Sequence, residues 1–577
     1  MAKRIDYDEW SKDELIKEIT RIKGTTYGLV WHRDLPEEKI DVLINPDART
    51  PSEMFPNEMA GKPFPVLKEA KAKAIQTDDA KPVNILIEGD NYHSLAVLNF
   101  THQAAVDVIY IDPPYNTGNK DFIYNDEFVD SEDPYRHSKW LSFMEKRLKL
   151  ARNLLKRTGV IFISIDDNEH AQLKMLCDEI FGEVNFVANF KWNRTAKAPS
   201  LSNTVRTKYE YVLCYRKEEP LMLFGKKSYN TQAPLLHLPN KPVEIIFPPK
   251  SIELPKEFAP GKYSEKYKVE LIDYIIVENG LNKNQFRIKG CFAWSQIKIN
   301  RYIKSGKRFL VKRDLSTIYY FMETEGSFIP PSDLISDEEC GVKRNTEAKE
   351  ETKDLGINFD HAKPVSLIKY LIRSATYDKK ETLILDFFAG SGTAGQAVLE
   401  LNTEDGGMRN FILCTNNRDE KSEHKIASDI CYPRVKKVIS GYKNQKGERI
   451  DGFGGNLRYY VTDFVEAGPS DKNKRKLVNE STEMLCIKEA AFNLVKESED
   501  FKIFKNADKH LGIIFHEDAI DDYKKAIKKI DGHFNTYVFS MTDDPHTIAF
   551  ADIKQKVTLC AIPEVILKVY REVFKHD

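Results

Sequence analysis

The stretch "DVIYIDPPY", residues 107–115, begins like a buried strand and stops abruptly at two prolines. Four apolar or aromatic residues run into Asp112, and Pro113, Pro114 and Tyr115 follow at once. Proline fixes the backbone φ angle and has no N–H donor, so these residues are unsuited to an internal strand. In open α/β sheets, ligands bind beyond the carboxyl ends of the strands. The stretch therefore predicts a strand that ends in a functional corner.

Strands and helices alternate on both sides of this stretch. The expected strands are apolar runs, and the segments between them have the apolar spacing of helices. Besides "DVIYID", strands are expected at "VNILIEG" (83–89), "GVIFISID" (159–166), "YEYVLCYR" (209–216), "TLILDFFAG" (382–390) and "NFILCTNN" (410–417). Such alternation predicts an α/β fold with a doubly wound, mostly parallel, Rossmann-like sheet.

The alternation is interrupted near residue 220 and resumes near residue 345. Prolines between these points are too frequent for regular strand–helix units, which indicates an insertion. Ser11 and Glu14 predict a capped N-terminal helix. The expected parts are an N-terminal helix and irregular arm (1–82), the two halves of the sheet domain (83–220 and 346–460), the insertion (221–345) and a small C-terminal α/β domain (461–577).

Composition excludes several classes of protein. The 577 residues are 41% hydrophobic and 30% charged, which is ordinary for a globular chain, and the net charge of −1 gives no global field for nucleic acid. Eight cysteines lie singly, without zinc spacing, so no metal is expected. No apolar run is long enough to cross a bilayer and "MAKRIDYDEW" has no signal core, so a cytoplasmic protein is expected.

The corner at Asp112 has the groups needed to hold a planar amine. One interpretation is only a strand that ends in a proline turn. The alternative is chemical: the stiff corner leaves carbonyl oxygens exposed and unpaired, and a carboxylate beside the carbonyl of Pro113 gives two acceptors for one –NH₂ group. Tyr115 offers a flat face for an aromatic ring. This combination predicts a site for the exocyclic amine of a base.

A second motif is "LDFFAGSGTAGQAV", residues 385–398. A strand ends in Asp386, and Gly390 and Gly392 allow the backbone to approach a ligand closely before a helix begins. The pattern is neither a phosphate loop, because no Lys-Ser/Thr pair follows, nor a G-x-G-x-x-G dinucleotide motif. A glycine-rich turn and a nucleotide-binding loop are both compatible with this motif alone.

Together the two motifs resemble those of DNA amino-methyltransferases, and in particular the modification subunits of type III restriction–modification systems. Asp112–Tyr115 matches the family's catalytic signature, and Asp386–Thr393 matches its S-adenosylmethionine loop. The catalytic signature precedes the cofactor loop, which is the order of the family's β group. The resemblance implies a methyltransferase fold, S-adenosylmethionine as cofactor and double-stranded DNA as substrate. It also implies a homodimer and a restriction (helicase–nuclease) subunit as partner.

The resemblance also implies residues for the cofactor. Lys363 and Pro364 would flank its methionine end, above Asp386. The rest of the cofactor loop would be Phe388, Ala389, Gly390, Ser391, Gly392 and Thr393. Family members often end the next strand with an acid that binds the ribose, whereas here that strand ends in Asn416 and Asn417, with Asp419 and Glu420 beyond. Asn416 can hydrogen-bond hydroxyls, so it is the candidate at this position.

The implied reaction is methylation of adenine N6 in DNA. Asp112 and the Pro113 carbonyl would accept hydrogen bonds from N6, Pro114 would stiffen the corner, and Tyr115 would stack on the flipped base, which contributes about 1–3 kcal/mol at such contacts. N4-cytosine methylation follows the same chemistry, and a protein-glutamine methyltransferase or a non-catalytic DNA specificity subunit are further alternatives. The two motif strands are expected to be neighbours where the strand order reverses.

A basic stretch lies in the insertion. Between Lys283 and Arg313 there are ten Lys or Arg and no Asp or Glu, interleaved with aromatic residues. A solvated charged face is one interpretation, and a surface that contacts phosphates is the other. The candidates for DNA contact are Lys298, Arg301, Lys304, Lys307 and Arg308.

Overall fold

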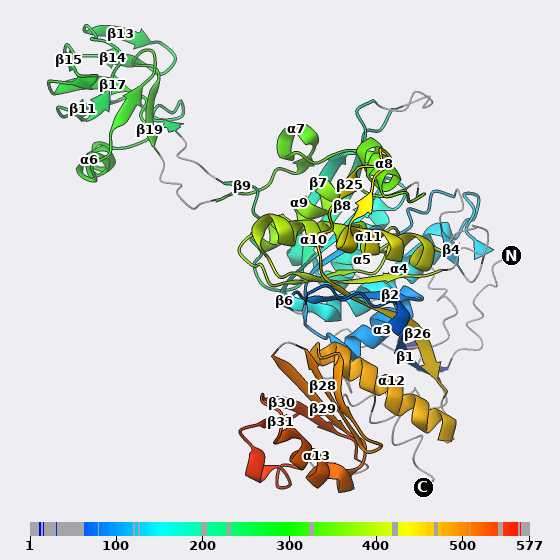
Figure 1. Ribbon diagram of the computed structural model, residues 1–577. Helices are drawn as coiled ribbons and strands as arrows, with labels where there is room; N and C mark the ends of the chain where they lie inside the picture. Colours follow the sequence, from blue (N-terminus) through cyan, green and yellow to red (C-terminus); the bar gives the residue numbers. More distant parts are fainter. Residues whose placement is uncertain are drawn as a thin grey trace. The chain divides into compact units, whose positions relative to one another are not determined.

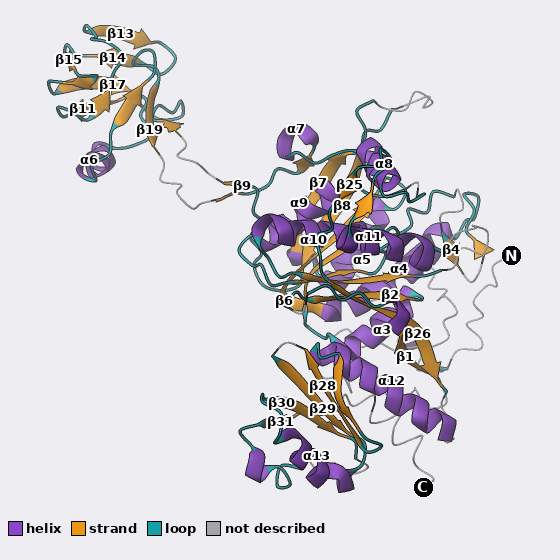
Figure 2. Ribbon diagram, viewed as in Figure 1, coloured by secondary structure: helices purple, strands orange, loops and turns teal. Residues whose placement is uncertain are grey.

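Ten strands form one sheet in the larger of the two units into which the chain divides. Figures 1 and 2 show strands of this unit together with the helices that pack on them. This unit comprises Met1–Leu223 and Ser332–Asp577, and the other comprises Phe224–Pro331. The sheet order is β1-β26-β2-β23-β22-β3-β6-β8-β7-β21. The strands are β1 (Phe64–Glu69), β26 (Asn456–Val465), β2 (Val83–Glu88), β23 (Asn410–Thr415), β22 (Leu383–Asp386), β3 (Val106–Ile111), β6 (Leu155–Ile165), β8 (Tyr209–Arg216), β7 (Phe186–Asn193) and β21 (Leu334–Ile335).

The computed structural model describes most of the chain from residue 63 onward. The described residues are 11, 12, 15, 16, 31, 63–78, 80–118, 122–124, 127–197, 205–227, 232–321, 328–359, 361–417, 425–466, 471–506, 508–540, 546–562 and 566. Most of the expected N-terminal helix and of the expected arm lies outside these residues, as do Asp419 and Glu420; of that helix, Lys12, Leu15 and Ile16 are described and are helical.

The six strands from β26 to β6 run parallel to their neighbours. β8 lies antiparallel between β6 and β7, and β1 lies antiparallel to β26 at the other edge. The predicted α/β fold with a mostly parallel sheet is therefore confirmed. Strands buried on both faces form from near-continuous apolar runs, as in β3 and β6.

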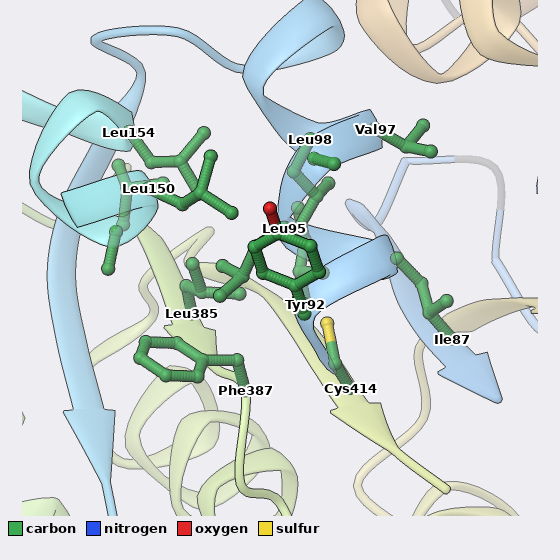
Figure 3. Close-up of a cluster of buried hydrophobic side chains, with 14 of the residues drawn as sticks. Ile87, Tyr92, Leu95, Val97, Leu98, Leu150, Leu154, Leu385, Phe387 and Cys414 are labelled. Carbon is green, nitrogen blue, oxygen red and sulfur yellow. The ribbon is translucent and has the colours of Figure 1, made fainter. Parts of the chain in front are cut away.

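Helices cover both faces of the sheet. One core contains α3 (Asn91–Thr101), α4 (Arg136–Leu154) and α5 (His170–Phe181), and the other contains α9 (Val365–Thr376), α10 (Thr393–Asp405) and α11 (Tyr432–Ser440). Because side chains alternate along a strand, Ile109 and Ile111 of β3 join the first core, and Val108 and Tyr110 join the second. Figure 3 shows part of the first core, where side chains of α3 and α4 meet those of β2, β22 and β23.

The outer part of the sheet differs from the prediction. Residues 64–69, expected in an irregular arm, form β1, because the run "FPVL" is buried throughout and the segment pairs antiparallel with β26. The expected boundary at residue 461 falls inside β26. Beyond it, α12 (Asp471–Glu489) packs on β1 and α3. A five-stranded sheet of β27 (Asn493–Glu497), β28 (Phe501–Asn506), β29 (Lys509–Ile514), β30 (Phe534–Val538) and β31 (Val557–Leu559) follows.

The smaller unit has its own apolar core. It contains a six-stranded and a four-stranded sheet, in the orders β10-β19-β18-β12-β16-β15 and β11-β17-β14-β13, and the helix α6 (Gln296–Lys304). The strands are β10 (Gln232–Pro234), β11 (Val243–Phe247), β12 (Ile252–Glu253), β13 (Gly261–Ser264), β14 (Val269–Leu271), β15 (Val277–Glu278), β16 (Leu281–Asn282), β17 (Phe286–Gly290), β18 (Phe309–Val311) and β19 (Ile318–Phe321). The observed limits, 224–331, are narrower than the expected 221–345, because Leu334 and Ile335 already pair with β7.

β22 and β3 are neighbours at the centre of the large sheet. Ile384 lies opposite Val108 and Leu385 lies opposite Ile109, in parallel register. From this pair the chain order proceeds outward in opposite directions, to β6 beside β3 and to β23 beside β22. The prediction that the strands before Asp112 and Asp386 are neighbours where the order reverses is confirmed. Within the described part of the chain, no helix is both long and apolar enough to cross a membrane. Among the same residues, no group of three or more His, Cys, Asp or Glu is placed to hold a metal ion.

Candidate functional site

Two carboxyl groups mark the carboxyl edge of the central strands. Asp112 is the first residue after β3, and Asp386 is the last residue of β22. Asp386 is buried, and burial raises its pKa well above the usual range, although the Phe388 N–H donates to it at 3.0 Å; the negative charge of Asp112 adds to the rise. Burial likewise raises the pKa of Asp112, against the opposing effect of Lys363. This concentration of acidic groups suits a positively charged ligand.

The corner after Asp112 is held by two aromatic side chains. The Tyr115 hydroxyl lies 2.9 Å from Asp112 Oδ1, to which it donates. The indole N–H of buried Trp140 donates to the Pro114 carbonyl at 2.7 Å. The prediction of unpaired carbonyls is therefore wrong for Pro114, because a helix packs directly beneath the corner. Pro113 is itself buried, so the corner is fixed against the protein interior.

A lysine and a second acid complete this part of the site. The Lys363 ammonium donates to both oxygens of Asp112, each at 2.9 Å. The same nitrogen lies 3.4 Å from Glu210 Oε2, which also lies 3.2 Å from the Tyr115 hydroxyl. The Lys363 ammonium is also 4.9 Å from the centre of the Tyr115 ring. Asp112, Tyr115, Lys363 and Glu210, here called the Asp112 cluster, thus form one connected group.

Asn116, directly after the corner, adopts the left-handed conformation with φ 57°. Its amide donates to Glu169 Oε1 at 2.5 Å, and that oxygen lies 2.7 Å from His137 Nδ1. The Glu169 side chain is fully buried, and burial raises its pKa to about 8. A protonated acid therefore anchors the backbone just beyond Tyr115.

The glycine-rich loop follows β22 and leads into α10. Gly390 and Gly392 have φ angles of 47° and 82°, in the region that favours glycine. A Cβ atom on Gly392 would lie 3.0 Å from Cys431 Sγ, so the loop lies against the start of α11. The Ala389 N–H donates to the Cys414 carbonyl at 3.1 Å, which ties the loop to β23.

Arg434 of α11 holds the same loop from below. Its Nη1 donates to the hydroxyls of Ser391 and Thr393, both at 2.8 Å, and its Nε donates to Gln396 at 2.9 Å. Arg434 is fully buried, and burial lowers its pKa to about 10. The hydroxyls of Ser391 and Thr393 therefore bind protein atoms, which indicates a structural task for both.

The other expected cofactor residues occupy the same edge of the sheet. Pro364 precedes the first residue of α9, and Lys363 points its ammonium at Asp112. The Asn416 carbonyl, just after β23, accepts a hydrogen bond from the Ala427 N–H at 3.2 Å. The side chain of Asn417 pairs with Glu88.

The basic stretch lies in the smaller unit. Lys298, Arg301 and Lys304 belong to α6 and are exposed, and Lys307 and Arg308 precede β18. The Lys298 ammonium lies 4.4 Å from the centre of the Trp294 ring, and Arg308 is 4.0 Å from Glu253. By contrast, Arg287 is committed to Asp273 at 2.9 Å. The five candidates thus lie on α6 and on the short segment between α6 and β18.

The sequence did not identify Glu210, Glu169 or Arg434 as parts of the site. Glu210 is the single acid in β8, which is otherwise apolar and aromatic up to Arg216 at its end, and this was the available signal. Glu169 and Arg434 lie in polar helix-start segments that resemble solvated surface. Burial, which the sequence does not reveal for such residues, is what distinguishes them.

Comparison with known proteins fits this geometry. The DNA methylase family matches residues 106–427, which span both motif strands. This chain belongs to the DNA methylase family. It is 35% identical over 395 residues to the Mod subunit of the type III restriction–modification enzyme StyLTI of Salmonella typhimurium, covering 62% of this chain and 57% of the relative.

Two further relatives are similar to this chain over nearly two thirds of its length. The Mod subunit of the type III enzyme EcoPI of Escherichia phage P1 is 30% identical over 427 residues, covering 65% of this chain and 63% of the relative. The type II methyltransferase M.KpnI of Klebsiella pneumoniae is 32% identical over 378 residues, covering 63% of this chain and 89% of the relative. The chain spans about three fifths of the length of the two Mod subunits it matches.

Proposed function

We propose that this DNA methylase transfers a methyl group from S-adenosylmethionine to N6 of an adenine flipped out of double-stranded DNA. The observation that carries the proposal is the parallel pairing of β22 with β3, which brings the Asp112 corner and the glycine-rich loop to one edge of the sheet. An amine acceptor and a loop suited to close backbone approach are the two parts that such a transfer needs. Similarity to Mod subunits and to the type II methyltransferase M.KpnI supports methyl transfer to DNA, without separating adenine from cytosine.

The residues beside the glycine-rich loop fit S-adenosylmethionine, which carries a positive sulfonium and an amino group. Among the described residues no lysine, arginine or histidine forms an ion pair with buried Asp386, so a cationic ligand would supply the missing charge. Gly390 turns the loop with a positive φ angle, a conformation that glycine adopts without strain, beside the ring of Phe359. We assign Asp386 and the Phe388–Thr393 loop to the cofactor, with Pro364 beside it and Asn416 at the ribose position.

The chemistry of the Asp112 corner follows from the weak nucleophilicity of an aromatic amine. S-adenosylmethionine supplies an activated methyl group, whose carbon–sulfur bond breaks with the electron pair left on sulfur as the nitrogen–carbon bond forms. Positive charge develops on N6, whose two N–H groups donate hydrogen bonds to Asp112 and to the Pro113 carbonyl. Acceptors aimed at developing charge in a site shielded from water contribute several kcal/mol. Afterwards N6 gives up one proton, for which Asp112 is the acceptor.

Adenine inside a duplex hides its amino group, so the base must leave the stack. Tyr115 follows the corner and offers its ring as the stacking platform. We propose adenine over cytosine because this corner begins with Asp and because it precedes the cofactor loop, the order of the family's β group. N4-cytosine methylation is the second candidate, supported by the same pair of acceptors.

We propose the basic surface of the smaller unit as the DNA contact. Lys298, Arg301 and Lys304 lie on one exposed helix in a stretch without acids, which fits a polyanion. By analogy with the Mod relatives, this chain would be the modification and recognition subunit of a type III restriction–modification system, acting as a homodimer beside a restriction subunit.

A labelled-donor assay tests the proposal. Unmethylated duplex DNA is incubated with the protein and S-adenosylmethionine carrying a labelled methyl group, and the DNA is then digested to nucleosides. Label in N6-methyl-2′-deoxyadenosine supports the proposal, and label in N4-methyl-2′-deoxycytidine supports the second candidate. Protein that binds DNA specifically but transfers no label to any of several genomic DNAs would identify a non-catalytic specificity subunit and contradict both.

A further inference from the structure

The Asp112 cluster poses an electrostatic problem for the proposed reaction, on which this inference rests. The buried Lys363 ammonium donates to both oxygens of Asp112 at 2.9 Å. A cation and an anion at this distance cancel most of each other's field. Positive charge develops on the target nitrogen, and a neutral Asp112–Lys363 pair stabilises such charge weakly. A further negative charge is needed beside the lysine.

Glu210 is placed to supply that charge. It lies at the start of β8, and its Oε2 is 3.4 Å from the Lys363 ammonium and 3.2 Å from the Tyr115 hydroxyl. The Glu210 side chain is only 8% exposed, so its charge acts with little screening. Burial lowers the pKa of Lys363, but Asp112 and Glu210 together outweigh burial and raise it, so the lysine stays charged. Two carboxylates and one ammonium leave one negative charge in excess.

Arg194 is the second cation at Glu210. Its Nη1 lies 3.5 Å from Glu210 Oε1, on the side of the carboxylate away from Lys363. The Arg194 side chain is 32% exposed, whereas that of Lys363 is 10% exposed, so water screens the arginine more strongly. Tyr110, Asp166 and Asp386 also act electrostatically on this cluster.

We propose that Glu210 is a positioning residue for methyl transfer. It holds the Lys363 ammonium and the Tyr115 hydroxyl, and thereby leaves Asp112 with net negative charge for the target amine. Glu210 approaches this edge because β8 runs antiparallel to β6, with Tyr211 opposite Ile165. The first residues of β8, rather than its last, therefore reach the carboxyl edge of the parallel strands.

Glu210→Gln tests the charge directly, because glutamine keeps the shape and the acceptor oxygen. Single-turnover methylation at saturating S-adenosylmethionine is expected to slow about 10- to 100-fold, less than the loss for a group that touches the amine. Donor affinity and the unfolding midpoint are expected to stay as in the wild type. Glu210→Asp, which keeps the charge, is expected to recover most of the rate. Glu218→Gln, at an exposed residue just after the end of β8, is the matched control.

The decisive variant is Glu210→Gln combined with Lys363→Met. In Glu210→Gln the Lys363 ammonium neutralises Asp112. Removing the lysine charge leaves Asp112 negative again, so the double variant is expected to methylate faster than Glu210→Gln by about fivefold or more. A purely structural role for Glu210 predicts a further loss instead. Wild-type rate in Glu210→Gln, or a double variant no faster than the single one, overturns the inference while leaving the proposed function intact. Wild-type protein without any methyl transfer overturns the proposed function itself.

Discussion

Glu169 links stability of the larger unit to pH, and Glu169→Gln is expected to remove that link. The Glu169 carboxyl is fully buried at the start of α5, where its Oε1 accepts from Asn116 and lies beside His137. Burial is the main cause of its raised pKa of about 8, and the nearby Arg136 opposes the rise. Burial also lowers the pKa of His137, so the histidine supplies no positive charge to ionise the acid.

The expected magnitude follows from the two states of the chain. An exposed glutamate has a pKa of 4.5, whereas folded Glu169 keeps its proton up to about pH 8. Below pH 4.5 both states hold the proton and the stabilisation is complete. Between pH 4.5 and about 8 the unfolded chain has released the proton that the folded chain retains, so stability falls over this range. Above about pH 8 the folded chain releases its proton too, and the fall ends. The difference between the two pKa values corresponds to about 5 kcal/mol in all, at 1.36 kcal/mol for each pH unit.

The assay is the unfolding midpoint of wild type and Glu169→Gln between pH 5.5 and 8.5. Glutamine keeps the acceptor for Asn116 and cannot ionise, so its advantage over wild type is expected to grow by several degrees across this range. Glu183→Gln, on the exposed turn after α5, is the control and should follow wild type at every pH. A constant gap between Glu169→Gln and wild type would show that Glu169 is already ionised in the folded protein, and would refute the reasoning.

Three further predictions concern the proposed reaction. Asp112→Ala is expected to abolish methyl transfer while donor affinity stays within about twofold, because Asp112 addresses the amine; near wild-type turnover would contradict the mechanism. Gly392→Val, which strains the loop against α11, is expected to weaken donor binding at least about tenfold, whereas Gly406→Val at the open end of α10 should not; equal donor affinities in a titration would argue against the loop assignment. Alanine at the three basic positions together is expected to weaken DNA binding and to lower its dependence on salt, because phosphate contacts are lost. The measurement is fluorescence anisotropy, with Lys262→Ala as the control. Unchanged affinity at low salt would show that the basic stretch is only a solvated face. The triple variant replaces Lys304, Lys307 and Arg308.

The central strands could be predicted because their sequences carry strong, redundant signals. Apolar runs that end in Asp112 and Asp386 fix two parallel strands, and the order of the two motifs fixes their adjacency. Backbone rules for parallel sheets then determine which ends meet. These rules depend little on side-chain detail, so the sequence was sufficient for this part of the site.

The place of Glu210 in the site could not be predicted, because it depends on the direction of β8. The rule that ligands meet the carboxyl ends of strands holds for parallel strands, and β8 is antiparallel. Its direction depends on long-range pairing with β6 and β7, which a local apolar run does not encode. The contact of Lys363 with Asp112 is equally inaccessible, because it depends on the rotamer that packing near Trp192 allows. β1 was missed because its pairing partner lies in β26, near the other end of the sequence.

The order of strands in the large sheet also determines when the sheet can fold during synthesis of the chain. β2 and β3 follow each other in the chain with only α3 between them, yet β23 and β22 separate them in the sheet. Both intervening strands leave the ribosome only after residue 382. Until then the facing edges of β2 and β3 have unpaired N–H and carbonyl groups and uncovered apolar side chains. The nascent chain must therefore wait, half folded and prone to aggregation, for its central strands, and a polypeptide released before Leu383 would be a substrate for chaperones and proteases.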